Sequence, residues 1–449
     1  MTISEKKRFS IVTLGCKVNQ YEGEAVANRL EQCGLTDCPK SGKADYCIIN
    51  TCAVTAKAAM QSRQAVRQAI RNHPGAHIIV TGCYAQIAPQ ELGAIQGVHR
   101  VIGQIEKYAI AELIGRMPDE PRGNNAPCSR KCLDSPFPQP PAVTYGYRSR
   151  PFLKVQDGCN ACCTYCIVPH ARGPSRSMPT AAVLAHLKEL GAAGFKEVVL
   201  TGIHLGCYGL DLAPQTHLAA LLTRLVAEGC VHRLRLSSIE PNELTDEIVG
   251  LAAPNSGAPT AICSHFHMPL QSGDDHILKQ MHRPYTSQFY CDRVEAIVRQ
   301  VPDVAIGSDV LVGFPGETDS AFENTIRLIE SLPLAYLHVF PFSRRKGTAA
   351  YGFTNQVAPA IIKQRCRRLR QLGHEKKTAF YRKFIGRPLE VLIERAQRSE
   401  HGWLRGISHN YIPVLIQGPE SLCHTLVTTQ VEEISGRPEA VGRLVAPVS

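Results

Sequence analysis

Three segments in the first 115 residues follow one plan, in which an apolar strand-like run ends close to a cysteine. The runs cover residues 9–14, 46–49 and 78–81, and the cysteines that follow them are Cys16, Cys52 and Cys83. Helical patterns at 22–32 and 56–71 separate the runs, so each repeat has the length of one βα unit. The plan predicts a doubly wound α/β domain that carries all three cysteines at the carboxyl edge of its parallel sheet, where such sheets bind ligands.

Three thiolates that converge at one sheet edge can hold three irons of a cubane cluster and leave the fourth iron without a protein ligand. For any one of these cysteines the alternative is a buried core residue, which is a common fate of free cysteine. Because the same placement recurs at three strand ends, we favour a metal site. Cys33, Cys38 and Cys47 lack this repetition, and we interpret them as packing residues.

A second set of cysteines lies in the run DGCNACCTYC, where Cys159, Cys163 and Cys166 have the spacing C-x3-C-x2-C. Three thiolates with this spacing hold three irons, and the open iron can be chelated by a small molecule with amino and carboxylate groups. This is the ligation of enzymes that cleave S-adenosylmethionine into a radical. Counting Cys162 gives an apparent doubled zinc motif, but structural zinc sites separate their cysteine pairs by a long loop. A zinc or redox site remains the alternative.

The composition limits the compartment and the partners. A chain of 449 residues is long enough for about three domains. The 18 cysteines follow an amino terminus without an apolar signal region, which predicts a cytoplasmic protein with reduced thiols and metal–sulfur sites. No apolar run approaches the roughly 18 residues of a membrane span. Lys and Arg exceed Asp and Glu by 50 to 39, and this surplus favours a polyanionic partner.

Strand and helix patterns alternate again between residue 151 and about residue 343, after a proline-rich linker at 117–148. The expected strands lie at 152–156, 197–201, 233–239, 265–270, 306–312 and 337–342. Six βα units without a further two predict a partial (β/α)6 barrel whose open side admits a large substrate. Polar and glycine-rich sequences follow these strands, so Ser237, Glu240 and Gln271 are candidates for cofactor or substrate contacts. Ordinary helix capping and turn chemistry is the alternative for each.

The carboxy-terminal part combines a basic helical stretch at 361–387 with short β-rich segments. The segments lie at 389–393, 403–407, 412–416 and 426–434. Their succession predicts a small barrel of the oligonucleotide-binding type, a shape that presents strands and loops to RNA. A charged helix packed between domains is the alternative for the basic stretch.

Several runs together carry a resemblance to a known family. They are TLGCKVNQYEGE, NTCAVTAKA, TGCYAQ, DGCNACCTYCIVPHARGPSRS, SSIEP, HMPLQSGDD, DVLVGFPGET and FPFSRRKGT. Over nearly the whole chain they are similar to the methylthiotransferase family of radical S-adenosylmethionine enzymes. The resemblance implies an auxiliary-cluster domain at 1–116, a linker at 117–148, a radical core at 149–378 and an OB-like TRAM barrel at 379–447.

One stretch and one local departure refine the resemblance. The run KVNQY after Cys16 resembles the branch that acts on N6-threonylcarbamoyladenosine at position 37 of tRNA. The branches that act on N6-isopentenyladenosine 37 or on a ribosomal-protein aspartate are the alternatives within the family. Related sequences commonly have Asn and an aromatic residue where this chain has Ala161 and Cys162, so a fourth thiol stands beside the three ligands.

The resemblance implies two 4Fe-4S clusters and a reaction in two parts. The cluster on Cys159, Cys163 and Cys166 would chelate S-adenosylmethionine and release a 5'-deoxyadenosyl radical. The cluster on Cys16, Cys52 and Cys83 would hold or supply the sulfur that a second S-adenosylmethionine methylates. Carbon 2 of the adenine needs a radical because its C–H bond is unactivated and not acidic.

Other residues and partners follow from the same resemblance. Tyr165 is expected to contact the cofactor adenine, and Glu240 its ribose or amino group. Arg172 and Arg176 are expected to meet phosphates of the anticodon loop, with structural ion pairs as the alternative. The partners would be the tRNA anticodon stem-loop, an electron donor such as a flavodoxin or ferredoxin, and the iron–sulfur assembly machinery. Two other classes stay open, a two-cluster electron-transfer protein and a non-catalytic RNA-binding protein.

Overall fold

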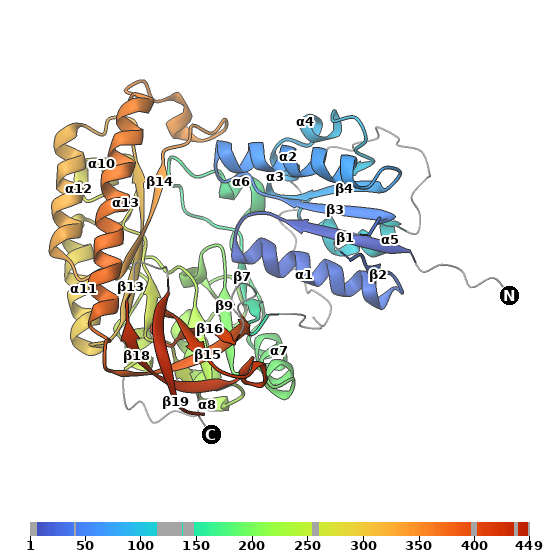
Figure 1. Cartoon of the computed structure of the whole chain (residues 1–449). Helices are drawn as coiled ribbons and strands as arrows, with labels where there is room; N and C mark the ends of the chain where they lie inside the picture. Colours follow the sequence, from blue (N-terminus) through green and yellow to red (C-terminus); the bar gives the residue numbers. More distant parts are fainter. Residues whose placement is uncertain are drawn as a thin grey trace. The chain divides into compact units, whose positions relative to one another are not determined.

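The computed structural model describes residues 7–39, 42–114, 137, 148–253, 260–396, 402–434 and 439–447 (Figure 1). The chain divides into two compact units that alternate along the sequence. The first unit comprises Met1–Gly146, Gln156–Met178 and Ser343–Tyr351, and the second comprises Tyr147–Val155, Pro179–Phe342 and Gly352–Ser449. The loop with Cys159, Cys163 and Cys166 therefore belongs to the same unit as the amino-terminal sheet. The domain boundaries expected from the sequence stay a prediction, and most of the expected linker lies outside the described residues.

The first unit is built on a parallel sheet with the strand order β2-β1-β3-β4-β5. The strands are β1 (Arg8–Thr13), β2 (Thr36–Asp37), β3 (Tyr46–Thr51), β4 (His77–Gly82) and β5 (Arg100–Val101). All residues of β3 are buried, as expected of a parallel strand that is covered on both faces. The register pairs Thr13 with Asn50 and Thr51 with Gly82, so the carboxyl ends of the three cysteine-bearing strands are aligned. The doubly wound α/β domain is confirmed.

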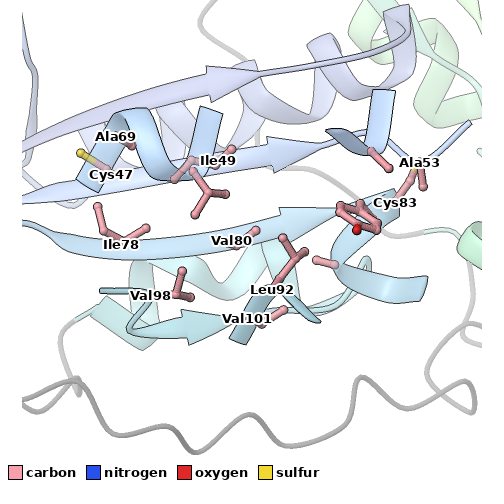
Figure 2. Packing of buried hydrophobic residues seen from close by; sticks show 14 of the residues in the cluster. Cys47, Ile49, Ala53, Ala69, Ile78, Val80, Cys83, Leu92, Val98 and Val101 are labelled. Atoms are coloured by element: carbon pink, nitrogen blue, oxygen red, sulfur yellow. The ribbon is translucent and has the colours of Figure 1, made fainter. Parts of the chain in front are cut away.

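Helices cover both faces of this sheet. They are α1 (Lys17–Gln32), α2 (Ala56–Asn72), α3 (Cys83–Ile87), α4 (Pro89–Gly93) and α5 (Ile110–Ile114). Side chains of α1 and α5 pack on one face, and those of α2 and α4 on the other. Figure 2 shows the core on the face covered by α2 and α4, with Cys47, Val80 and Leu92 inside it and Cys83 at one end. Helix α1 begins at Lys17, five residues earlier than expected, because Val18 and Tyr21 already supply buried apolar positions.

Two short strands and one short helix frame the cysteine loop of the first unit. The strands β7 (Gln156–Asp157) and β8 (Arg176–Ser177) pair antiparallel, with Asp157 opposite Arg176. Between them the chain forms the loop and then the helix α6 (Val168–Arg172). The pairing holds the two ends of the loop together.

The second unit has the six expected parallel strands in their expected order. They are β6 (Phe152–Lys154), β9 (Glu197–Thr201), β10 (Arg233–Leu236), β12 (His265–His267), β13 (Ala305–Val312) and β14 (Tyr336–Pro341). The neighbours β6, β9 and β10 pair in one sheet, and β12, β13 and β14 in another. A parallel bridge between Ser238 and His267 joins the two. In the described residues β6 and β14 each have one neighbour in this series, as expected of a partial barrel with an open side.

Helices follow the strands of the second unit and pack on their outer side. They are α7 (Thr180–Ala192), α8 (Leu218–Glu228), α9 (Asp246–Leu251), α10 (Asp275–Gln280), α11 (Ser287–Gln300) and α12 (Asp319–Ser331). The side chain of Ser308 in β13 points to the outer face of the sheet, because its hydroxyl lies 3.1 Å from the Tyr290 hydroxyl of the helix α11. The alternate residues of β13, including Asp309, point to the inner face of the barrel. A short additional strand, β11 (Ala261–Ile262), pairs with β10.

The carboxy-terminal residues form the helix α13 (Pro359–Arg382) and a closed five-stranded barrel. The strands are β15 (Pro388–Ala396), β16 (Trp403–Ser408), β17 (Pro413–Gln417), β18 (Leu426–Glu433) and β19 (Ala440–Pro447). The closed barrel agrees with the expected OB-like fold, and β19 is a strand that the sequence pattern did not reveal. Buried Arg365 pairs with Glu317, so part of the basic stretch packs against the larger barrel. None of the described helices is long and apolar enough to cross a membrane.

Candidate functional site

The three strand-end cysteines of the first unit lie close together. Asn19 ties their strands to one another, because its Nδ2 donates to the carbonyl oxygens of Leu14 at 2.7 Å and Thr51 at 3.1 Å. Burial and the neighbouring thiols of Cys83 and Cys16 raise the pKa of Cys52 to about 11. Thiols influence each other in this way only at short range. The predicted convergence of Cys16, Cys52 and Cys83 thus has a structural basis.

The backbone beside this cysteine trio is shaped for close approach. Gly15 has φ +101°, and a Cβ atom at this position would lie 2.9 Å from Cys52 Sγ. Only glycine fits there, since side chains are strained at this φ and crowded at this distance. Cys52 and Cys83 are buried, whereas Cys16 is exposed, so the trio has one open side. A site of three thiol ligands with one open side suits a cluster that has a free iron.

The loop with Cys159, Cys163 and Cys166 is also held in a fixed shape. The Cys159 amide donates to the Gly173 carbonyl at 3.1 Å, and the Cys166 amide to the Cys163 carbonyl at 3.0 Å. Gly158 has φ +73°, and a Cβ atom there would lie 1.9 Å from the Pro174 carbonyl oxygen. The three cysteines are half-buried, so they are accessible to iron. Both the donor set and the open geometry fit a 4Fe-4S cluster.

Cys162, the additional thiol of this loop, differs from its neighbours in exposure. It is exposed, and its Sγ lies 3.8 Å from the Asn160 carbonyl oxygen. The three predicted ligands are half-buried by comparison. Cys162 thus differs in exposure from the three predicted ligands, and its role as a ligand or a bystander is tested below by substitution.

The three candidates of the second unit each follow a barrel strand. The Ser237 hydroxyl is buried and has no hydrogen-bond partner among the described residues, a condition that suits a ligand contact. Glu240 forms an ion pair with Arg283, which fixes its carboxylate. Gln271 has φ +64°, an uncommon conformation for a residue other than glycine and one that often marks a functional position. Cofactor contacts by these residues stay predictions.

Tyr165 belongs to the first unit and is half-buried next to the third cysteine of the loop. Its neighbour Thr164 accepts a hydrogen bond from the Ala350 amide at 2.8 Å, which anchors this end of the loop. The contact of Tyr165 with a cofactor adenine also stays a prediction.

The phosphate contacts expected of Arg172 and Arg176 do not agree with the structure. Arg172 is only 1% exposed, and its Nη1 donates to Glu22 Oε1 and to Asp157 Oδ1, both at 2.9 Å. Arg176 is also buried, and its Nη2 donates to the Arg172 carbonyl at 3.0 Å. Both residues thus form the internal ion pairs that were the alternative. The sequence did not decide this point, because the same basic residues serve either purpose.

A cluster on the inner face of β12, β13 and β14 escaped the sequence reasoning. Asp309 Oδ1 lies 2.9 Å from His267 Nε2 and 3.2 Å from His338 Nδ1. Burial alone would raise the pKa of Asp309, but hydrogen bonds from the two histidines hold it well below its usual range. The Tyr336 hydroxyl lies 3.3 Å from His267 Nδ1 and extends the network. These residues stand at inward-facing positions of neighbouring strands. The sequence did contain this signal, because inward and outward positions alternate along each barrel strand.

A basic pocket lies within the second unit, next to the small barrel. Its volume is about 330 Å³, and it is lined by Arg148, Ser149, Arg150, Phe152, Glu394, Arg395 and Arg405. Glu394 pairs with Arg150 and Arg405, and the lining thus contains four arginines and one carboxylate. The excess of positive charge suits a phosphate group.

Two family models and several curated relatives match this chain. The model "Uncharacterized protein family UPF0004" matches residues 8–103, and "Radical SAM superfamily" matches residues 153–329. The threonylcarbamoyladenosine tRNA methylthiotransferase MtaB of Bacillus subtilis is 37% identical and aligns over 97% of this chain and 96% of its own length. The MtaB protein of Rickettsia prowazekii is 40% identical over 91% of both chains.

A relative with another printed substrate and one solved structure complete the comparison. The tRNA-2-methylthio-N(6)-dimethylallyladenosine synthase of Novosphingobium aromaticivorans is 32% identical over 89% of both chains. The radical S-adenosylmethionine methyltransferase TsrM of Kitasatospora setae has a TM-score of 0.55 and 14% identity, and the match covers 77% of this chain and 74% of that one. At this identity the structure supports the fold alone.

Proposed function

The chain belongs to the MtaB family of radical S-adenosylmethionine methylthiotransferases, and from this premise we propose that it methylthiolates carbon 2 of N6-threonylcarbamoyladenosine at position 37 of tRNA. The observation that carries the proposal is the convergence of Cys16, Cys52 and Cys83 at one sheet edge. They lie in the same compact unit as the C-x3-C-x2-C loop. A radical enzyme without a sulfur-donating site would need only the loop.

The residues of the loop prepare the binding of S-adenosylmethionine. When bound, a 4Fe-4S cluster supplies an open iron for the amino and carboxylate groups of the cofactor and the electron that cleaves it. Gly158 and the pair β7–β8 fix the ends of the loop that carries the three thiols, which supports this proposal. The carboxylate of Glu240, fixed by Arg283, and the unpartnered Ser237 hydroxyl are polar groups that suit the ribose and amino groups of the cofactor.

We propose that the strand-end trio holds a second 4Fe-4S cluster. The donor set supports it, since all three cysteines are free thiols and one side of the trio is open. Burial raises the pKa of Cys52 to about 11, so this thiol is protonated in the metal-free protein. Metal binding must therefore release its proton.

The proposed partner is the anticodon stem-loop of tRNA, and a tRNA substrate supports the proposal of a cytoplasmic location. Exposed basic residues of α13 and the arginine pocket beside the small barrel are complementary to an RNA backbone. The cluster loop also requires a one-electron donor, for which a flavodoxin or ferredoxin is suitable. Assembly of both clusters requires the iron–sulfur assembly machinery.

Mass spectrometry of tRNA nucleosides from a strain that lacks this protein tests the function. We expect loss of 2-methylthio-N6-threonylcarbamoyladenosine and accumulation of the nucleoside without the methylthio group. The wild-type gene should restore the product, whereas the Cys163→Ala gene should not. Persistence of the product in the deletion strain contradicts the proposal. Loss of the dimethylallyl nucleoside instead would assign the chain to that substrate.

A further inference from the structure

A buried ion cluster in the first unit connects helix α1, which follows Cys16, with the segment that leads to Cys159. Arg172 donates to Glu22 and Asp157 through Nη1 and to Asn19 Oδ1 through Nη2 at 2.5 Å. Lys107 is fully buried and donates to Glu22 Oε2 at 2.7 Å. Two cations thus face two carboxylates, and all four side chains are buried. Removing these four charges from water costs free energy, so the stability of the fold alone does not explain the ion cluster.

Arg172 lies close to the strand-end cysteines. The Asn19 Oδ1 atom that accepts a hydrogen bond from Arg172 also lies 3.8 Å from Cys83 Sγ. Burial alone would lower the pKa of Arg172, but Cys83 and Glu22 raise it well above its usual value. One side chain, that of Asn19, thus separates the buried guanidinium from the trio.

Arginine is the residue that can keep its charge here. The guanidinium stays protonated in proteins, whereas burial lowers the pKa of the neighbouring Lys107. A fixed cation in a medium of low dielectric stabilises added negative charge nearby much more than the same cation in water does. Reduction of an iron–sulfur site adds such a charge, and nearby charges set its reduction potential.

We propose that Arg172 is a positioning residue that raises the reduction potential of the cluster held by Cys16, Cys52 and Cys83. This inference rests on the proposed function, because it requires that cluster. Formation of a C–S bond between a carbon radical and a methylthiolate uses the single electron of the radical and one electron of a sulfur pair. One electron is left over, and a ferric iron site with a raised potential is a suitable acceptor.

The arginine also connects the two cysteine sites mechanically. Asp157 precedes Cys159 by two residues, and Asn19 follows Cys16 by three. Through these two side chains one guanidinium fixes the backbone beside both sites. Lysine can replace its charge but not its fork of hydrogen bonds. Substitutions at position 172 can therefore separate the effect of the positive charge from the effect of the hydrogen bonds.

A redox titration of the full-length, anaerobically reconstituted protein, followed by EPR, tests the inference. The strand-end cluster is identified as the signal that S-adenosylmethionine does not perturb. Arg172→Met should lower the equilibrium constant for its one-electron reduction at least tenfold, which is about 59 mV. Arg172→Lys should recover most of this loss. Glu22→Gln should change the potential in the opposite direction, because it removes a negative charge and keeps the side-chain volume.

Arg365→Met is the matched control, since Arg365 is a buried arginine paired with Glu317 in the second unit. It should destabilise the protein without moving the potential. The inference is overturned if Arg172→Met keeps the wild-type potential at full iron content. If Arg172→Met fails to retain iron, Glu22→Gln decides, and an unchanged or lowered potential overturns the inference. A wild-type protein with only one cluster contradicts the second cluster itself, and so the proposed function.

Discussion

Replacing Glu197 by glutamine tests how the second unit is held together. Glu197 is fully buried and accepts hydrogen bonds from Arg235 Nε at 2.6 Å and Arg233 Nε at 2.7 Å. The same two arginines donate to the small barrel, to the carbonyls of Ser408 at 2.9 Å and Ile407 at 3.0 Å. The carboxylate therefore fixes the guanidiniums that connect the large barrel with the small one.

The magnitude follows from the charges that the substitution leaves behind. Removing one partner of a buried ion pair costs about 3–5 kcal/mol, and glutamine keeps the volume and one acceptor, which favours the lower end. At roughly 2 °C per kcal/mol for a large unit, we expect Tm to fall by about 6 °C. Arg233 is also paired with Glu390, so it retains one carboxylate.

The pH dependence of this effect has a definite sign. Burial would raise the pKa of Glu197, but Arg235, Arg233 and Arg150 hold it well below its usual range. A carboxyl group with a depressed folded-state pKa contributes stability above its unfolded pKa of about 4.3, and this contribution is lost as the pH falls. The difference between wild type and Glu197→Gln should therefore be constant near neutral pH and shrink below about pH 4.

Calorimetry of the full-length protein measures this difference, with Glu323→Gln as the control. Glu323 pairs with Arg368 on the surface, where an ion pair contributes about 1 kcal/mol or less. If Glu197→Gln unfolds within 1 °C of the wild type at pH 7, the carboxylate does not hold the arginines as described, and the reasoning is refuted.

Three further predictions concern the cysteine loop and the RNA surface. Gly158→Ala places a Cβ against the Pro174 carbonyl oxygen, so the loop should lose its cluster, and the iron content should fall by about half while the strand-end cluster is retained. Cys162→Ser should leave the iron content and the tRNA product unchanged but remove one rapidly alkylated thiol from the reduced apoprotein, whereas loss of iron would show that Cys162 is a ligand. Arg395→Ala, in the basic pocket, should weaken RNA binding and reduce the slope of log K against log salt by about 1, and an unchanged slope would exclude a phosphate contact there.

The sequence predicted most of the architecture because both large folds are built from repeated βα units. Apolar runs such as Ile78–Thr81, each bounded by glycine or polar residues, mark parallel strands without further information. The strand β19 escaped because Gly442 and Arg443 interrupt its pattern. Hydrogen bonds from neighbouring strands hold a barrel strand in place, so its own sequence need not show a regular strand pattern.

The candidate site also combines features that the sequence predicts with features that it does not. Cysteine spacing and strand-end position are local features, so the sequence alone could predict both cysteine sets. The environment of Arg172 is not local, since Glu22 lies 150 positions away. The inner-face cluster of His267, Asp309 and His338 likewise comes from three strands that meet only in the folded protein. Whether a basic residue faces RNA or an internal carboxylate is decided by such distant partners.

The alternation of the two compact units limits how the protein can be dissected. A fragment that starts at residue 149 would keep every cysteine of the loop, yet it would remove Glu22 and Asn19, on which Arg172 depends. Asp157 would then share a buried space with an arginine that has lost its other partners. Modular expression of the radical core alone is therefore a poor route to a working catalyst, and the amino-terminal residues act as a built-in scaffold for a loop that lies more than a hundred positions downstream.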